Sequence, residues 1–116
     1  MTLLGTFIKI NGIYDIICAL CILKKVNIPI LNNLHLSVIK NYSGDNDLFE
    51  RFYAYWIFTY GIIRLSNNVE LISFSYFIEA VFFINEYSIG TVYKDTVIFI
   101  VISCLLLGYA SRVYKL

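Results

Sequence analysis

The sequence predicts an all-α polytopic membrane protein, a four-helix transmembrane bundle that forms a single domain over residues 1–116. Hydrophobic residues make up 59% of the chain and charged residues only 15%, and the mean hydropathy is +0.75. Soluble domains of this size are far less apolar. The apolar residues also fall into four long stretches, each about long enough to cross a bilayer, with a longer linker after the first and short polar breaks after the second and third.

The first apolar stretch covers residues 3–23 and ends at a pair of lysines. About 20 residues of helix cross the hydrocarbon core of a membrane, so this stretch is a predicted span. Small residues recur in it every seven positions, and such a seam lets a second helix approach closely. These predicted helix-packing residues are Gly5, Gly12 and Ala19.

Residues 29–40 predict a short amphipathic helix at the membrane interface, between the first two spans. Pro29 suits a first helical turn, and apolar residues follow it at helical spacing. The segment 41–46 reads Asn-Tyr-Ser-Gly-Asp-Asn, which is typical of a loop.

The second predicted span covers residues 48–65. Asp47 and Glu50 resemble a capping box at its start, because a side-chain acceptor is followed three residues later by an acid. Aromatic rings lie near both ends of the stretch, and such rings suit the headgroup level of a bilayer.

The third and fourth predicted spans cover residues 69–87 and 92–109. Asn67 and Glu70 form a second capping pair, and Gly90 suits the left-handed residue that ends a helix. The short break between these spans predicts an antiparallel hairpin. A stripe of small residues in the fourth span predicts a packing face, within the bundle or between copies, and includes Cys104 and Gly108.

Two acids lie near the middle of their predicted spans, Asp15 in the first and Glu79 in the third. Charge is costly at that depth, so we expect both acids to point at protein and to form a site for a proton, a cation or a polar ligand group. Their predicted partners are Asn11, Tyr60 and Arg64. The alternative is that each acid is neutral or hydrogen-bonded and only sets helix register.

Arg64 lies next to the end of its predicted span, where a long cation usually extends to the interface. We therefore expect it to be a terminal cation, which pairs with Glu70 across the short turn if it pairs at all. Its participation in the carboxylate site is the second interpretation.

The sequence predicts no metal site and no cofactor. His35 is the only histidine and has no cluster of ligands around it in the sequence. Cys18 and Cys21 form a CxxC pattern, as in four-span membrane enzymes that reduce quinones, but the predicted loops lack the second cysteine pair that such enzymes need. The net charge of +1, with no basic run longer than two lysines, argues against a nucleic-acid partner.

Three short motifs resemble small four-span membrane proteins encoded by large DNA viruses, and the layout is similar to DoxX-like four-helix membrane proteins. The motifs are residues 11–15 (Asn-Gly-Ile-Tyr-Asp), residues 54–61 (Ala-Tyr-Trp-Ile-Phe-Thr-Tyr-Gly) with Arg64, and residues 78–80 (Ile-Glu-Ala). The resemblance implies a multi-pass location in a host cell membrane or a virion membrane. It transfers no catalytic residue.

The first functional hypothesis is a structural or interaction role in a cellular or virion membrane. Its predicted partners are the lipid bilayer, further copies of the chain, and other membrane or capsid proteins. The alternative is a small transporter or a proton- or ion-conducting protein that uses the two acids. A membrane thiol oxidoreductase is the more distant alternative; otherwise no enzymatic activity is predicted.

Overall fold

The structure is a computed structural model that describes residues 2–114, and the other residues of the predicted domain lie outside that range. The described chain forms four α-helices, one short 3-10 helix and no strand, which confirms the all-α class. The elements are α1 (Leu3–Ile22), η1 (Leu36–Val38), α2 (Asp47–Leu65), α3 (Val69–Ile89) and α4 (Lys94–Val113).

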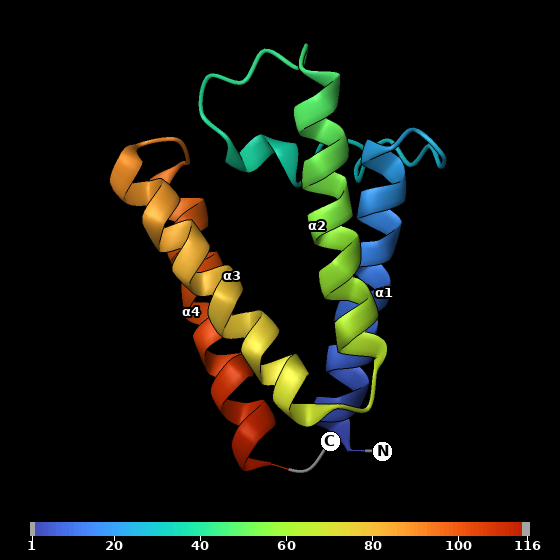
Figure 1. The fold of residues 1–116 in the computed structure, drawn as a ribbon, viewed down its shortest axis with the longest axis vertical. Coiled ribbons are helices and arrows are strands. Elements are labelled where there is room, and N and C mark those ends of the chain that lie inside the picture. The colour runs from blue at the N-terminus through green and yellow to red at the C-terminus, as the bar shows by residue number, and fades with distance from the viewer. Residues whose placement is uncertain (1, 115–116) are drawn as a thin grey trace.

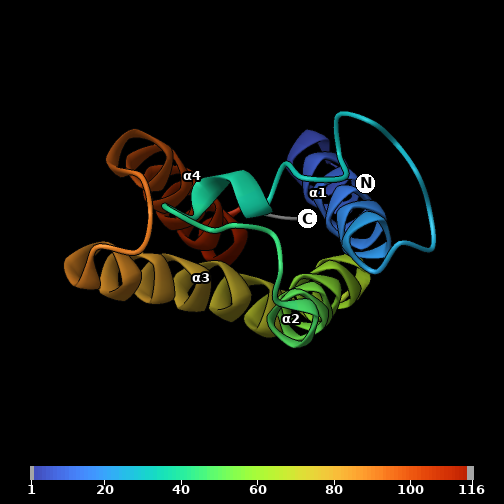
Figure 2. The same cartoon turned by 90° about the horizontal axis from the view of Figure 1, so that it is seen from above.

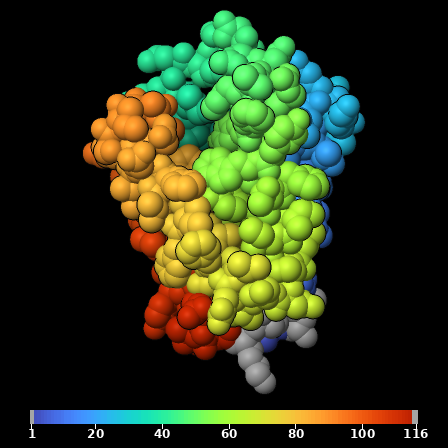
Figure 3. All heavy atoms as spheres, viewed as in Figure 1, coloured from blue at the N-terminus to red at the C-terminus, as the bar shows by residue number. Residues whose placement is uncertain are grey.

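The helices form two hairpins, with α1 packed against α2 and α3 packed against α4. The hairpins come together at the lower end of Figure 1, near the short connection from α2 to α3, and diverge toward the upper end. Viewed from above, η1 lies over the space between them (Figure 2). Linker residues are also visible between the upper ends of α2 and α3 (Figure 3).

The predicted interfacial helix over residues 29–40 is wrong. The segment consists of turns followed by the three-residue η1. Asparagine side chains compete with helical hydrogen bonds here, because Asn32 Oδ1 accepts from the backbone N–H of Ile28 at 3.1 Å and Asn32 Nδ2 donates to Asn27 Oδ1 at 2.7 Å. The carbonyl of His35 accepts from the Tyr53 hydroxyl at 2.9 Å, so a tertiary contact also holds the segment.

The end of this linker ties the two hairpins together. Leu36 packs on a buried cluster formed by α1 and α2, whereas Val38 is buried with side chains of α3 and α4. Two backbone hydrogen bonds join the same segment to the α3–α4 connection, from Lys40 N to the Thr91 carbonyl at 2.8 Å and from Tyr93 N to the Val38 carbonyl at 3.1 Å. The linker therefore closes the upper end of the space between the hairpins.

The helix ends differ slightly from the predicted ones. The N-caps of α2 and α3 are Asn46 and Asn68, each adjacent to the predicted Asp47 and Asn67, so both predicted capping pairs are wrong by one residue. Each asparagine oxygen accepts from the backbone N–H three residues later, at 3.0 and 3.1 Å. Gly90 has φ +96° and ends α3 in the left-handed conformation, as predicted.

Helix α4 runs from Lys94 to Val113, later at both ends than the predicted 92–109. Val92 instead forms an isolated antiparallel bridge with Ile39 and is buried. The linker thus forms hydrogen bonds with the Thr91 carbonyl and the Tyr93 N–H, which would lie in the first turn of a helix that started at residue 92.

The backbones of α1 and α2 approach closely at Gly12 and Gly61. A Cβ atom at Gly12 would lie 2.9 Å from the Gly61 carbonyl oxygen, and one at Gly61 would lie 2.8 Å from the Gly12 carbonyl oxygen. Only glycine fits such an approach. Gly5 and Ala19, the other residues of the seam, are also buried.

The small-residue stripe of α4 packs within the chain. Cys104 is buried in a cluster with Tyr76 and other α3 side chains. Gly108 lies against the Phe77 ring, and its carbonyl accepts from the Ser73 hydroxyl at 2.8 Å. Helix α3 therefore covers this face, and a second copy of the chain cannot reach it without separating the hairpin.

Two helices, α1 and α4, are long and apolar enough to cross a membrane. Large apolar side chains are exposed on the outer faces of all four helices. On α2 and α3 they include Phe52, Phe74 and Val81, with 61%, 59% and 59% of their surface accessible.

Candidate functional site

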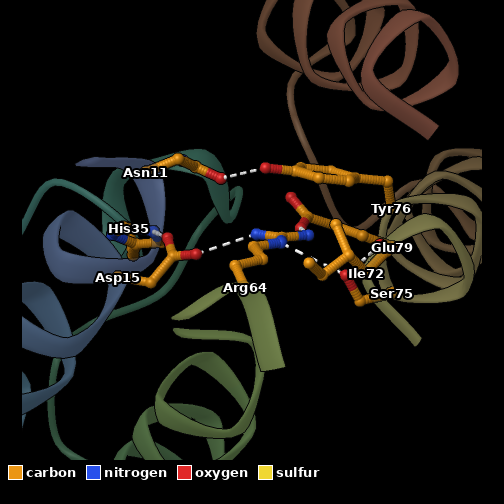
Figure 4. A network of polar contacts seen from close by, with 8 residues as sticks. All are labelled: Asn11, Asp15, His35, Arg64, Ile72, Ser75, Tyr76 and Glu79. Atoms are coloured by element: carbon orange, nitrogen blue, oxygen red, sulfur yellow. Dashed lines mark hydrogen bonds and ion pairs between the residues drawn. The ribbon is translucent and has the colours of Figure 1, made fainter. Parts of the chain in front are cut away.

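Three charged side chains from three helices meet between the hairpins. Arg64 of α2 donates from Nη1 to Asp15 Oδ2 of α1 and from Nη2 to Glu79 Oε1 of α3, both at 2.8 Å (Figure 4). Asp15 and Arg64 are 5% and 2% exposed, and Glu79 is partly buried. We call these three residues the charge triad. One arginine thus bridges two carboxylates and both hairpins.

Arg64 is not a terminal cation at the interface, so that prediction is wrong. Helical side chains lean toward the N-terminus of their own helix, and α2 runs antiparallel to α1. Although Arg64 lies in the last turn of α2, its side chain can therefore extend back into the molecule rather than out of it. Its carboxylate partners are Asp15 and Glu79, not the predicted Glu70.

Two rings and a hydroxyl hold the guanidinium in place. Its Cζ atom lies 3.9 Å from the Tyr76 ring centroid and 4.8 Å from that of Tyr60, which are cation–π distances. Nε donates to the Ser75 hydroxyl oxygen at 3.3 Å, and that hydroxyl donates to the Ile72 carbonyl at 2.7 Å. Arg64 is therefore a fixed part of the site.

Asn11 and Tyr60 both lie beside the charge triad, Asn11 through a hydrogen bond to Tyr76 and Tyr60 through its ring. Asn11 Oδ1 accepts from the Tyr76 hydroxyl at 2.7 Å, a direct polar bond between α1 and α3 (Figure 4). Tyr60 places its ring against Arg64, but its hydroxyl is buried and has no hydrogen-bond partner among the described residues. All five predicted site residues therefore come together.

His35 is a site residue that sequence reasoning missed. Its Nε2 lies 3.9 Å from Asp15 Oδ1, and its ring centroid lies 5.6 Å from that of Tyr14. Burial lowers the pKa of His35 and nearby Arg64 lowers it further, whereas Glu79 acts in the opposite direction. No spacing in the sequence relates His35 to Asp15, because the linker fold brings them together.

A cavity of about 510 Å³ surrounds the triad. Its walls come from all four helices and from the linker. Two buried polar atoms in its walls, His35 Nδ1 and Tyr60 Oη, have no hydrogen-bond partner in the described chain. The lining residues are Asn11, Tyr14, Asp15, Leu34, His35, Ser37, Val38, Tyr53, Trp56, Ile57, Tyr60, Arg64, Tyr76, Glu79, Phe83, Thr96, Phe99, Ile100, Ser103, Cys104 and Leu107.

The ionised triad carries a net charge of −1, since two carboxylates share one guanidinium. The neutral form of His35 is favoured and adds no positive charge. Within residues 2–114, no group of three or more histidine, cysteine or acidic side chains is placed to hold a metal ion. Cys18, Cys21 and Cys104 are buried free thiols.

No protein-family model, no curated protein and no solved structure matches this chain. The resemblance to small viral four-span proteins and to the DoxX-like layout therefore stays a prediction.

Proposed function

We propose that the chain is a four-span integral membrane protein whose cavity between the hairpins binds a proton or a cation, as in a small transporter or conducting protein. The membrane location is supported by the distribution of apolar side chains. Exposed rings and aliphatic chains cover all four helices, including α2 and α3, whereas five polar or charged residues are buried inside. Water-soluble proteins seldom expose such extensive apolar surface.

The distribution of charge supports four spans rather than two. Outside the triad, the charged side chains on α2, α3 and α4 lie within about five residues of a helix end. Lys9 lies further inside α1, but its ammonium group donates to the Leu65 carbonyl at the end of α2 at 3.2 Å. At a rise of about 1.5 Å per residue, the 19 and 21 residues of α2 and α3 span about 28 and 32 Å, close to a hydrocarbon core of about 30 Å.

The shared arginine is the observation on which cation binding depends. An unbalanced charge in a low-dielectric interior costs on the order of several kcal/mol, even after the surrounding protein has relaxed around it. Because Arg64 balances only one of the carboxylates, the remaining negative charge must attract a proton or a cation. The cavity has room for one beside the triad.

A scaffold role is the alternative, and one observation weakens it. The small-residue stripe that would have bound a second copy is already covered by α3. Exposed apolar side chains elsewhere suit lipid as well as a protein partner.

Proton and cation flux into liposomes tests the proposal. We expect wild-type protein, reconstituted under a potassium diffusion potential, to raise proton or sodium uptake above that of empty liposomes. Glu79→Gln should abolish the uptake because the triad is then balanced. Glu70→Gln, which makes the same chemical change in the exposed first turn of α3, should leave it intact. Wild-type liposomes that behave like empty ones would refute a conducting role, and partners captured by crosslinking would then favour the scaffold.

A further inference from the structure

We propose that the cavity binds a lipophilic organic monocation, a protonated amine with an apolar body, which enters with its ammonium group toward Asp15 and its body against the aromatic wall. The inference rests on the proposed function and names the class of cation. It follows from the size of the cavity, the kind of polar atoms left unpaired in it, and its rings.

The cavity is large for an inorganic ion. Its volume of about 510 Å³ lies within the roughly 300–1,000 Å³ of sites that hold small organic molecules. A proton or a dehydrated sodium ion would leave most of that space unused. The described residues also provide no cluster of three metal-binding side chains.

The unpaired polar atoms match a hydrogen-bond donor. Asp15 Oδ2 is engaged by Arg64, whereas Oδ1 faces His35 Nε2 at 3.9 Å, beyond hydrogen-bond distance. If the neutral imidazole carries its hydrogen on Nε2, toward the carboxylate, then Nδ1 has a free lone pair. Tyr60 is only 7% exposed, and its buried hydroxyl also has no hydrogen-bond partner among the described residues. An ammonium group placed toward Asp15 donates an N–H to Oδ1, and its other N–H groups suit acceptors of the kind left unpaired in these walls.

The charges of the site exclude an anionic ligand. Arg64 is the cation of the site, but both terminal nitrogens already donate to carboxylates and its faces lie near Tyr60 and Tyr76. A ligand carboxylate or phosphate would meet Asp15 and Glu79 before it reached the guanidinium. Like charges at that range repel strongly in a low-dielectric site.

Aromatic rings line the cavity around the triad and suit the apolar body of the amine. Trp56, Tyr53 and Phe83 lie in its wall, and the Trp56 ring centroid is 5.2 Å from that of Tyr60. Ring faces attract an organic ammonium group and stack on its hydrocarbon body. Trp56 is also the single tryptophan of the chain, so its fluorescence is a probe of this wall. Because Trp56 also lines a second pocket, comparison with Glu79→Gln assigns the response to the triad cavity.

The test is a titration of Trp56 fluorescence in detergent with 4-phenylbutylamine, which is protonated at pH 7, beside its neutral isostere 4-phenylbutan-1-ol. We expect a saturable change with the amine and at least about tenfold weaker binding of the alcohol. Glu79→Gln should weaken amine binding by about tenfold or more, whereas Glu70→Gln should bind as wild type does. Tyr60→Phe, which removes only the unpaired hydroxyl, should weaken it by about fivefold without altering the helical circular dichroism.

Equal binding of amine and alcohol, or an unchanged amine affinity in Glu79→Gln, would overturn the inference. The failure is distinguishable from that of the proposed function. Proton or sodium flux that Glu79→Gln abolishes, together with no Trp56 response to the amine, would overturn the organic ligand and leave cation binding in place. Absence of both signals in wild type would overturn both.

Discussion

Replacing Arg64 by glutamine should destabilise the protein strongly, because the cation shared by two carboxylates is removed. Both ion pairs have 2.8 Å contacts, and Arg64 is only 2% exposed. Removing one partner of a buried pair leaves an uncompensated charge and costs about 3–5 kcal/mol. We expect Arg64→Gln to lower the free energy of unfolding by about 3–5 kcal/mol. Protonation of the carboxylates would make the loss smaller.

The matched substitution Glu79→Gln should be tolerated far better. It leaves one positive and one negative charge, Arg64 with Asp15, so the buried charges balance. The glutamine carbonyl oxygen replaces Glu79 Oε1 as the acceptor for Arg64 Nη2. The difference between a charged and a neutral hydrogen bond, about 1 kcal/mol, is lost, and removal of the unbalanced charge offsets that loss.

The assay is reversible unfolding of the two variants and wild type in mixed micelles, followed by helical circular dichroism as the fraction of denaturing detergent rises. The reasoning predicts that Arg64→Gln unfolds well before Glu79→Gln. Equal losses in the two variants would refute it, because the triad would then be a closed network that needs each member, with no unbalanced charge to attract a cation.

Three further outcomes follow from the packing and the linker. Gly12→Leu should cost about 1–3 kcal/mol in the same unfolding assay, because a Cβ there already meets the α2 backbone at 2.9 Å; a neutral result would mean that the hairpin opens freely. Tyr76→Phe should cost about 1 kcal/mol by removing the bond to Asn11, and an Asn11→Ala background should abolish that difference if the bond carries it. Burial lowers the pKa of His35 in the folded protein, so the unfolded chain binds this proton at higher pH. The stability that neutral His35 contributes is complete above about pH 6.5 and falls as the pH drops below that value. The difference in unfolding free energy between wild type and His35→Gln should therefore shrink on acidification. A difference that grows instead would mean that His35 becomes a cation paired with Asp15.

The helices could be predicted closely because their signals are local. A long apolar stretch, a polar break and a cap are read from neighbouring residues, and the predicted start of the second span lies one residue from the observed start of α2. The one predicted helix that does not form covers residues 29–40. There the asparagine bonds and the contact of Tyr53 with the His35 carbonyl outweighed helical spacing.

By itself the sequence determined four helices, their apolar character and the two acids placed deep within them, since length and hydropathy set each of these residue by residue. Only the tertiary structure decided how the acids are used. Arg64 is 49 residues from Asp15 and 15 from Glu79, and it meets both because the hairpins bring α1, α2 and α3 to one point. His35 joins them through a linker with no regular periodicity. Contacts of this kind depend on helix crossing and side-chain direction, which no local pattern encodes.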